Sequence, residues 1–402
     1  MNIPEEYRFI VQLGRALHKY GVPSYRIQEY LKEVSATQNI QGDFMDLPTW
    51  VNYVFYDSED QHTYNYIRNV QPGEYNLSAL GETVDITNQF LSGELKVSEA
   101  RQALKDLEQK PMLHRKMVQA FAYGVTASAF SILMEANYIT IITSFIIGFV
   151  IGAFAIMAQR SSYLNSALES LAAFIATILT GCIYFFFPQV NLLLTVIASI
   201  IVFVPGMAIT RALEEITSKS LVSGTAKLFD ALVSLFKQFF GVMLGLSIWK
   251  YIFDLPPMTA GTVPPSWLGW IAIPLFLLSL VPIFNIRKKD IVGCVIIGFI
   301  SYGLMLSLDE LGPMVSTFIA SVSVILISKL IKKITASPEI IFSTLGILML
   351  VPGSKAFLGL SSAFQINETV DNASQIGLQV AYILMGVIGG LIFSGVFKQT
   401  KG

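Results

Sequence analysis

The chain has 402 residues, of which 53% are hydrophobic and 14% are charged, and its mean hydropathy is +0.59. This composition excludes a water-soluble protein of that length and is typical of a polytopic α-helical membrane protein. The formal net charge of −1 gives no electrostatic reason to expect a nucleic-acid partner. Cys182 and Cys294 lie in separate apolar runs, so neither a disulfide framework nor a cysteine metal site is expected.

Residues 1–112 have the composition of a small soluble domain. Their first segment is charged throughout and has no apolar core, so no cleaved signal peptide is expected. Glycine and proline in Gly21-Val22-Pro23 end one helical pattern and begin the next. We expect a cytosolic α/β domain in the order α-α-β-β-α-α, with helices on one face of a two-stranded sheet. The predicted elements are helices over 4–19 and 23–36, a β-hairpin over 43–56 and 61–70, and helices over 77–92 and 97–109.

Ten apolar runs follow one another from residue 116 onward. Each is near the ~20 residues that an α-helix needs to cross about 30 Å of hydrocarbon. They predict ten membrane spans in two sets of five, one within residues 113–255 and one within 256–402. The runs cover residues 116–134, 138–158, 164–187, 190–208, 226–252, 265–285, 289–307, 312–331, 336–353 and 373–396.

Lysine and arginine alternate along the connections between these runs. They follow the even-numbered runs, as Arg160 follows the second and Arg287 the sixth. The connections after runs one, three, five and seven contain neither residue, and the one after run nine contains only Lys355. Because positively charged connections stay on the cytoplasmic side, we expect a plasma-membrane (inner-membrane) protein with both termini in the cytoplasm.

An internal repeat relates the two sets of runs. The motif Val-Pro-Gly occurs at 204–206 and again at 351–353, and Ile-Ile-Gly-Phe occurs at 146–149 and at 296–299. Each set holds five runs, and five is odd, so the second set must enter the membrane from the opposite side. The sequence therefore predicts two inverted five-helix repeats.

The two Val-Pro-Gly motifs are candidate binding sites. Pro205 and Pro352 remove a helix N–H, and Gly206 and Gly353 let the backbone change direction. Half-helix ends at membrane depth expose backbone groups that can bind the carboxylate or ammonium of a small zwitterion. The alternative is that each motif only ends an ordinary span.

A polar stripe marks the fifth run. Lys227, Asp230, Ser234 and Lys237 are spaced by three, four and three residues and so share one helical face. Lys237 lies near the middle of the membrane, where a charged residue is costly and usually functional. We expect Asp230, Ser234 and Lys237 to contact the substrate and Asp230 to carry a proton. In the alternative reading, Lys227 and Asp230 form an interfacial ion pair and Lys237 extends to the membrane surface.

Two further charged residues complete the candidate site. Glu169 is expected one to two turns inside the cytosolic end of the third run and is a candidate proton carrier. The alternative is a solvated residue at the membrane interface. Arg211 is the sixth residue after Pro205 of the first Val-Pro-Gly motif. The sixth residue after the proline of the second motif is Leu358. The charges thus lie in the first half, where we expect substrate charge and protons to be handled.

Other motifs indicate structure rather than catalysis. Glycines spaced by four residues, as in Gly241 and Gly245 or Gly386 and Gly390, predict close helix packing. The three histidines are scattered in the soluble part, and no Ser-His-Asp order, zinc motif or phosphate-binding loop occurs. We therefore expect no enzyme activity, no cofactor and no metal.

Several stretches resemble the threonine/serine exporter family. They are ALHKYGVPSYRIQEYL (16–31), GELKVSEARQALKDLE (93–108) with HRKM after it, VPGMAITRALEEITSKSLVSGTAKLFDAL (204–232) and LVPGSKAFLGL (350–360). The resemblance implies a two-module exporter of L-threonine and L-serine that is driven by the proton gradient. It implies functional positions at Pro205, Gly206, Arg211, Ser223, Gly224, Asp230, Pro352 and Gly353, and a basic residue where this chain has Leu358.

These observations predict a secondary transporter that exports small hydroxy amino acids in exchange for protons. Its partners would be a small amino acid, protons and the lipid bilayer, and the sequence leaves a homo-oligomer open. Two alternatives stand beside this hypothesis. One is an exporter of other small amino acids or peptides. The other is a membrane-anchored hydrolase or sensor that acts through the N-terminal domain.

Overall fold

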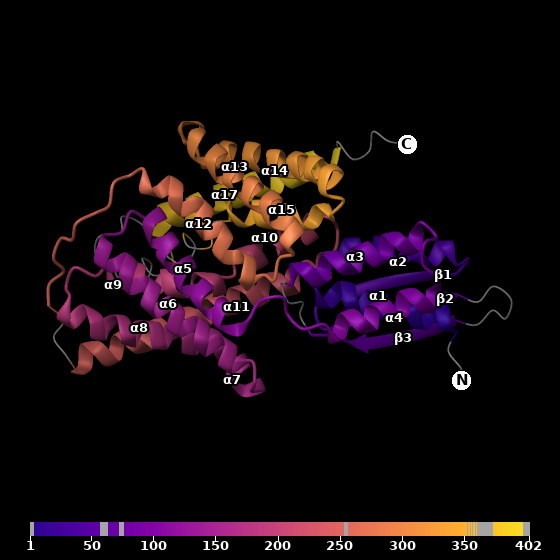
Figure 1. Ribbon diagram of the computed structural model, residues 1–402, viewed down its shortest axis with the longest axis horizontal. Coiled ribbons are helices and arrows are strands. Elements are labelled where there is room, and N and C mark those ends of the chain that lie inside the picture. The colour runs from indigo at the N-terminus through magenta and orange to yellow at the C-terminus, as the bar shows by residue number, and fades with distance from the viewer. Residues whose placement is uncertain are drawn as a thin grey trace.

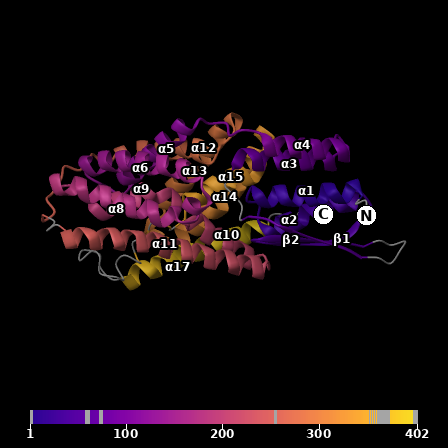
Figure 2. The ribbon, with the colours of Figure 1, turned by 90° about the horizontal axis from the view of Figure 1, so that it is seen from below.

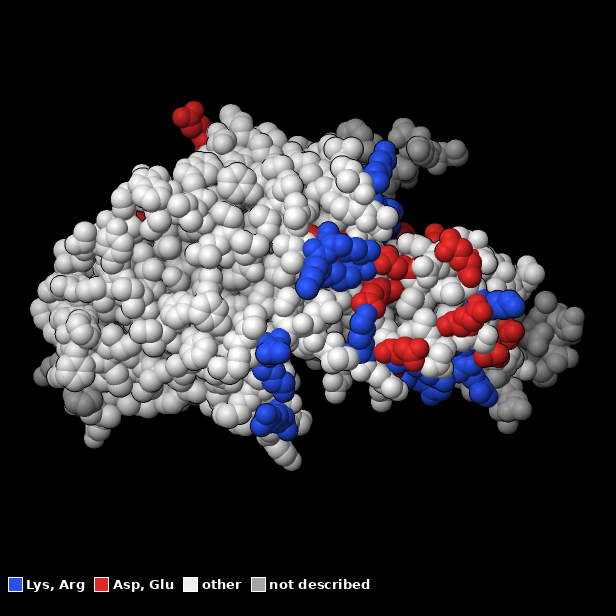
Figure 3. Space-filling model, viewed as in Figure 1, with Lys and Arg blue, Asp and Glu red and all other residues white. Residues whose placement is uncertain are grey.

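The computed structural model describes residues 4–56, 63–71, 76–252, 256–351, 353, 355, 357, 359 and 373–396. It is elongated, with a small α/β domain at one end and a helical region forming the remainder (Figure 1). Lys and Arg gather where the two parts meet, whereas the visible surface farther from the domain carries few charged side chains (Figure 3). We call the end of the helical region that contacts the α/β domain the domain end, and the opposite end the far end.

The α/β domain has two helices, three strands and two more helices in chain order. The helices begin and end within a few residues of the predicted positions, because their apolar side chains recur at helical spacing and face one core. The elements are α1 (Glu5–Lys19), α2 (Ser24–Thr37), β1 (Gln41–Leu47), β2 (Trp50–Tyr56), β3 (Thr63–Asn69), α3 (Leu77–Leu91) and α4 (Val97–Gln109).

The predicted two-stranded hairpin is wrong, because residues 43–56 contain parts of two strands. Leu47 pairs with Trp50, so Pro48 and Thr49 form a two-residue turn between them. Proline has no N–H to donate and a fixed φ, which stops the first strand at this point. The result is an antiparallel sheet in the order β1-β2-β3.

The four helices cover one face of the sheet, as expected. Figure 2 shows them on one side of the strands. Along β2, Val51, Tyr53 and Phe55 are fully buried under the helices. On the opposite face Met45 and Ile67 remain exposed. The domain core is therefore built on one side of the sheet only.

The helical region consists of a first half, α5 to α11, and a second half, α12 to α17. All ten predicted runs coincide with helices. The helices are α5 (Lys116–Leu133), α6 (Tyr138–Ala158), α7 (Ser162–Ser166), α8 (Leu168–Phe186), α9 (Leu192–Ile200), α10 (Gly206–Thr217), α11 (Leu221–Ile252), α12 (Leu268–Ile283), α13 (Ile291–Ser307), α14 (Pro313–Thr335), α15 (Glu339–Leu348) and α17 (Ala373–Val396), with short 3-10 turns η1 (Ile201–Phe203), η2 (Lys288–Asp290) and η3 (Asp309–Leu311).

Six helices in the described part of the chain are long and apolar enough to cross a membrane, and a bent pair makes a seventh. The protein is therefore a multi-pass membrane protein. The other predicted runs form shorter or less apolar helices. Among them, α15 has 10 residues, so at 1.5 Å per residue it extends about 15 Å, half the thickness of the hydrocarbon layer.

The bent pair lies at the first Val-Pro-Gly motif. Helix α9 tightens into η1, Val204 is extended, and α10 begins at Gly206. The two segments meet at 49°. The fourth run was predicted to end at residue 208, but a new helix continues to Thr217 in a different direction, because proline cannot continue the first helix.

The two halves pack alike. Helix α8 packs against α11 in the first half, and α14 packs against α17 in the second. In both cases two glycines of the second helix, α11 or α17, face the helix against which it packs. Gly241 lies against Ser170 and Ala173 of α8, while Gly386 and Gly390 lie against α14. The predicted role of these glycines in close helix packing is confirmed.

The α/β domain is held by a loop of the second half and by helix α11 of the first half. On the second half, the N–H of Leu77 donates to the carbonyl of Phe284 at 2.9 Å, and Arg287 binds Asp85 at 2.7 Å. On the first half, the Ser24 hydroxyl contacts the Ser223 hydroxyl at 2.7 Å. The domain therefore bridges the two halves at the domain end.

Candidate functional site

A cavity of about 640 Å³ lies between the two halves of the helical region. Helices α5, α10 and α11 and the turn η1 line it from the first half, and α12, α13, α14 and α17 line it from the second. Its volume falls within the roughly 300–1,000 Å³ of small-molecule sites. Much of the lining is apolar, and a few polar side chains face inward.

The two Val-Pro-Gly motifs meet at the wall of this cavity. A Cβ atom added to Gly206 would lie 3.0 Å from the Cα of Gly353 and 2.5 Å from Cγ1 of Val351. A Cβ added to Gly353 would lie 3.1 Å from the Cα of Gly206. Only glycine permits this approach. The structure thus brings together two breaks about 147 residues apart; Pro352 itself lies outside the described residues.

A glutamine that sequence reasoning missed supports the first break. Pro205 interrupts the helical hydrogen bonds, and the freed carbonyl of Phe203 accepts a hydrogen bond from Nε2 of Gln238 at 2.8 Å. Gln238 is fully buried in α11, and its Oε1 has no partner among the described residues. Its position four residues after Ser234, on the same helical face as that predicted residue, is the signal that could have identified it.

Two of the predicted residues, Ser234 and Glu169, form a hydrogen-bonded chain with this glutamine, and a third, Lys237, forms an ion pair with Glu169. Gln238 Nε2 donates to Ser234 Oγ at 3.3 Å, and Ser234 Oγ donates to Glu169 Oε1 at 2.7 Å. Lys237 Nζ lies 3.6 Å from Glu169 Oε2. Glu169 and Ser234 line the cavity, and Lys237 acts as the partner of Glu169 at its edge. A carboxylate and an ammonium on adjacent helices therefore flank the site.

Asp230 also lines this cavity. Its carboxylate forms no hydrogen bond or ion pair with any residue in the described part of the chain. The alternative reading of an interfacial Lys227–Asp230 pair is wrong, because Lys227 binds Glu215 instead. Glu215 is nearly fully buried and therefore attracts the nearest cation. Asp230 is left available within the cavity.

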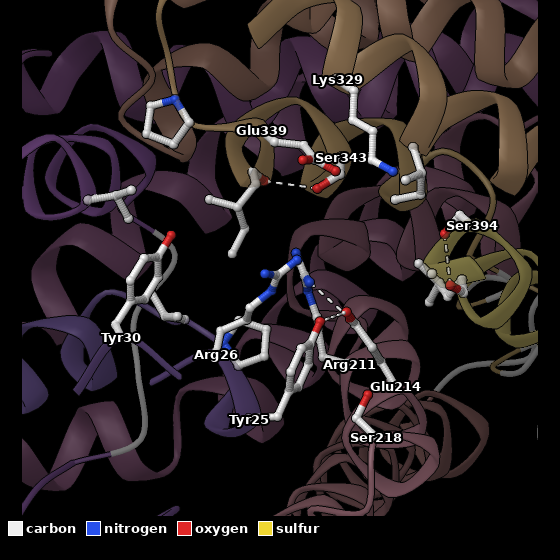
Figure 4. Close-up of a pocket in the computed structure, with 18 of the residues that line it drawn as sticks. Tyr25, Arg26, Tyr30, Arg211, Glu214, Ser218, Lys329, Glu339, Ser343 and Ser394 are labelled. Atoms are coloured by element: carbon white, nitrogen blue, oxygen red, sulfur yellow. Dashed lines mark hydrogen bonds and ion pairs between the residues drawn. The ribbon is translucent and has the colours of Figure 1, made fainter. Parts of the chain in front are cut away.

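Arg211 lies elsewhere. Its guanidinium donates to Glu214 Oε2 at 2.9 Å and to the Thr344 hydroxyl. It lines a second cavity between the helical region and the α/β domain (Figure 4). Because α10 turns away after the break, a residue six positions beyond Pro205 no longer faces the first cavity. The structure therefore separates Arg211 from the other predicted substrate residues.

The second half contributes polar residues that the sequence did not single out. Asp309 in η3 and Lys355 both line the first cavity, as do the buried hydroxyls of Ser316 and Thr317 at the start of α14. The sequence pointed to the charged residues of the first half, but the cavity lining also includes charged residues of the second half. Both halves place charged side chains in the cavity.

The α/β domain holds a serine, a histidine and an aspartate in contact. His18 Nδ1 lies 2.7 Å from Asp46 Oδ1, and Ser24 Oγ donates to Asp46 Oδ2 at 2.6 Å. In a hydrolase triad the histidine accepts the proton of the serine. Here serine and histidine occupy opposite oxygens of one buried carboxylate, and Ser24 also contacts Ser223. The arrangement fastens the domain to α11 and does not match a nucleophile.

Comparison with known proteins identifies the family of this chain. A family model described as "Putative threonine/serine exporter" matches residues 8–249, and one described as "Threonine/Serine exporter, ThrE" matches residues 270–397. The chain belongs to the threonine/serine exporter family. The resemblance found in the sequence is thereby confirmed, and each of the two matched stretches of this chain contains one Val-Pro-Gly motif. No solved structure matches the chain.

Curated relatives with the name "Pheromone-regulated membrane protein 10" match the whole chain of this exporter-family member. The protein of Eremothecium gossypii is 25% identical over 426 residues, which cover 100% of this chain and 57% of the relative. That of Saccharomyces cerevisiae is 22% identical, covering 100% and 55%. That of Kluyveromyces lactis is 22% identical, covering 100% and 44%. The chain thus spans about half the length of these relatives.

Proposed function

We propose that this protein exports L-threonine and L-serine in exchange for protons, through the cavity between its two halves. One observation carries the proposal. The two Val-Pro-Gly breaks, one from each half, touch at Gly206 and Gly353 in the cavity wall. Paired helix breaks between two repeats are typical of substrate sites in secondary transporters, because they offer backbone groups to a polar solute at membrane depth.

The substrate would be held by both backbone and side chains. The N-terminal end of α10, with Met207 and Ala208 in the cavity wall, presents the positive end of the helix dipole to the substrate carboxylate. Asp230 is the acceptor for the ammonium group, since it has no other partner among the described residues. The chain of Ser234 and Glu169 offers groups for the substrate hydroxyl.

Asp230 is also the better proton carrier of the two predicted acids. Lys237 lies 3.6 Å from Glu169 and offsets its charge. Protonation of Glu169 would leave that lysine without its counter-ion, whereas protonation of Asp230 breaks no ion pair. We therefore assign the exchange of proton and substrate ammonium to Asp230, and assign to Glu169 and Lys237 the task of ordering the site.

The proposal includes the arrangement in the membrane. Residues 1–112 form the cytosolic domain, and residues 113–255 and 256–402 form two inverted repeats of five membrane segments each. The like packing of α8 with α11 and of α14 with α17 supports the repeat. The alternating Lys and Arg of the connections support both termini in the cytoplasm and a location in the plasma membrane.

Counterflow of labelled L-threonine in proteoliposomes tests this function. The parent protein should exchange threonine, and an imposed pH gradient should drive net flux. Asp230→Asn should abolish gradient-driven flux, while Glu310→Gln, an exposed far-end acid outside the cavity lining, should not. Competition by unlabelled alanine and serine distinguishes a hydroxy amino acid site from a general one. No flux of any small amino acid through the folded parent protein would overturn the proposal.

A further inference from the structure

A second cavity, of about 730 Å³, lies where three parts of the chain meet. Helix α2 of the α/β domain lines it from one side, α10 of the first half from another, and α14, α15 and α17 of the second half from the third. Figure 4 shows Lys329 and Glu339 on one side of this space and Arg26 and Arg211 on the other. We call it the junction cavity.

Positive charge exceeds negative charge in its lining. The charged residues are four cations and two acids: Arg26, Arg211, Lys329, Lys332, Glu214 and Glu339. One of the acids is already engaged, since Glu214 accepts hydrogen bonds from Arg211 and, at 2.9 Å, from the hydroxyl of Tyr25. Burial, and then the charge of Glu214, raise the pKa of Tyr25 well above its usual value, so this hydroxyl stays protonated as a donor.

The two lysines of the lining have no counter-ion in the part of the chain that the structure describes. Lys329, Lys332 and Glu339 form no hydrogen bond or ion pair with any other residue that the structure describes. Arg26 pairs with the exposed Glu29 at 3.2 Å, outside the cavity lining, and its guanidinium lies 5.6 Å from the centre of the Tyr25 ring. The lining thus holds two lysines without a partner among the described residues, beside Arg26 and one such acid, Glu339. Cations that converge on a shared cavity repel one another, and a bound anion removes that repulsion.

One wall of the junction cavity opens toward apolar helix surface. Ile325 of α14 and Leu391 and Ile392 of α17 line it. Ile392 is 52% exposed, and Ile334 farther along α14 is 83% exposed. The cavity therefore sits where the apolar surface of the helical region gives way to the charged domain. Basic pockets at this level of a membrane protein are suited to phosphate headgroups.

We propose that the junction cavity binds a phosphate-bearing anion, which bridges Arg26 of the α/β domain and Lys329 and Lys332 of the second half. The headgroup of an anionic lipid and a soluble phosphorylated metabolite share this chemistry. Arginine and lysine both form charge-assisted hydrogen bonds to phosphate oxygens. The bound anion joins the domain to the second half and so stabilises the docked arrangement. This site is separate from the transport cavity, and the inference does not depend on the transported solute.

Binding to the full-length protein in nanodiscs tests the inference in two arms. In the first arm, native mass spectrometry counts retained phosphatidylglycerol in discs that mix it with phosphatidylcholine. In the second, calorimetry measures inorganic pyrophosphate binding in discs of phosphatidylcholine alone, at constant ionic strength. The double variant Lys329→Gln, Lys332→Gln should weaken binding roughly tenfold or more in whichever arm shows binding to the parent protein.

Controls separate this site from general surface charge. Lys288→Gln with Lys289→Gln removes two exposed lysines outside the cavity lining and should leave binding unchanged. Lys329→Arg with Lys332→Arg keeps the charges and should restore binding if the glutamine variant remains folded. Retention of lipid alone identifies a headgroup as the ligand, and binding of pyrophosphate alone identifies a soluble one. Equal losses in both double glutamine variants, or no binding to the parent in either arm, would overturn the inference.

Discussion

The contact between the two helix breaks leads to a sharp prediction for Gly206→Ala. The new Cβ would lie 2.5 Å from Cγ1 of Val351 and 3.0 Å from the Cα of Gly353. The valine methyl can rotate, but the backbone of Gly353 can only move away as a unit. Such overpacking costs about 1–3 kcal/mol. The higher helix propensity of alanine offsets little of this cost. Its advantage over glycine, up to ~1 kcal/mol, applies to helix interiors, and Gly206 is the first residue of α10.

The assay is threonine counterflow combined with thermal unfolding of the purified protein. We expect Gly206→Ala to lower the apparent unfolding temperature and to reduce flux about ten- to a hundredfold, since binding groups displaced by ~1 Å lose such factors. Gly303→Ala is the matched control, because a Cβ at Gly303 inside α13 meets no atom within 4 Å. Unchanged flux and unchanged stability in Gly206→Ala would show that the two breaks do not touch.

Three further predictions follow from buried polar contacts. Gln238→Ala leaves the carbonyl of Phe203 without its 2.8 Å donor, and should cost about 1–3 kcal/mol in the free energy of unfolding and lower threonine flux. Arg287→Ala removes the cation that holds the fully buried Asp290 at 2.6 Å, and should cost about 3–5 kcal/mol, measured by denaturant or thermal unfolding. Ser24→Ala removes the hydroxyl between Asp46 and Ser223, and should increase proteolysis at the domain junction and cost about 1–3 kcal/mol.

Exposed residues of the same types serve as controls for these substitutions. Gln102→Ala in α4, Arg8→Ala in α1 and Ser92→Ala after α3 each change an exposed side chain. Surface changes of this kind stay within about 0.5 kcal/mol. If any buried substitution behaves like its exposed control, the hydrogen bond assigned to it contributes nothing measurable to the fold or to the site.

The helices of this protein and the break at its first Val-Pro-Gly motif follow from the local sequence alone. Apolar runs form helices wherever they occur, since a buried or membrane-embedded backbone must satisfy its own hydrogen bonds. Proline and glycine interrupt those helices at residues 204–206 for steric reasons that need no distant partner. The same rule explains why the predicted strand over 43–56 is wrong, because Pro48 ends the first strand and splits that segment in two.

Tertiary structure decided which of these local features act together. Gly206 touches Gly353, Gln238 reaches the Phe203 carbonyl, and α10 carries Arg211 into the junction cavity. None of these contacts follows from spacing along one helix. The first two join residues at least 35 positions apart, and the third depends on the direction in which α10 bends. Helical periodicity placed Asp230 and Lys227 on one face, but α10 packs against α11 and gives Lys227 a different carboxylate, that of Glu215. Asp230 is left without a partner among the residues that the structure describes. The elements were thus set by local sterics and hydrophobicity, and the partners of the polar side chains were set by how those elements pack.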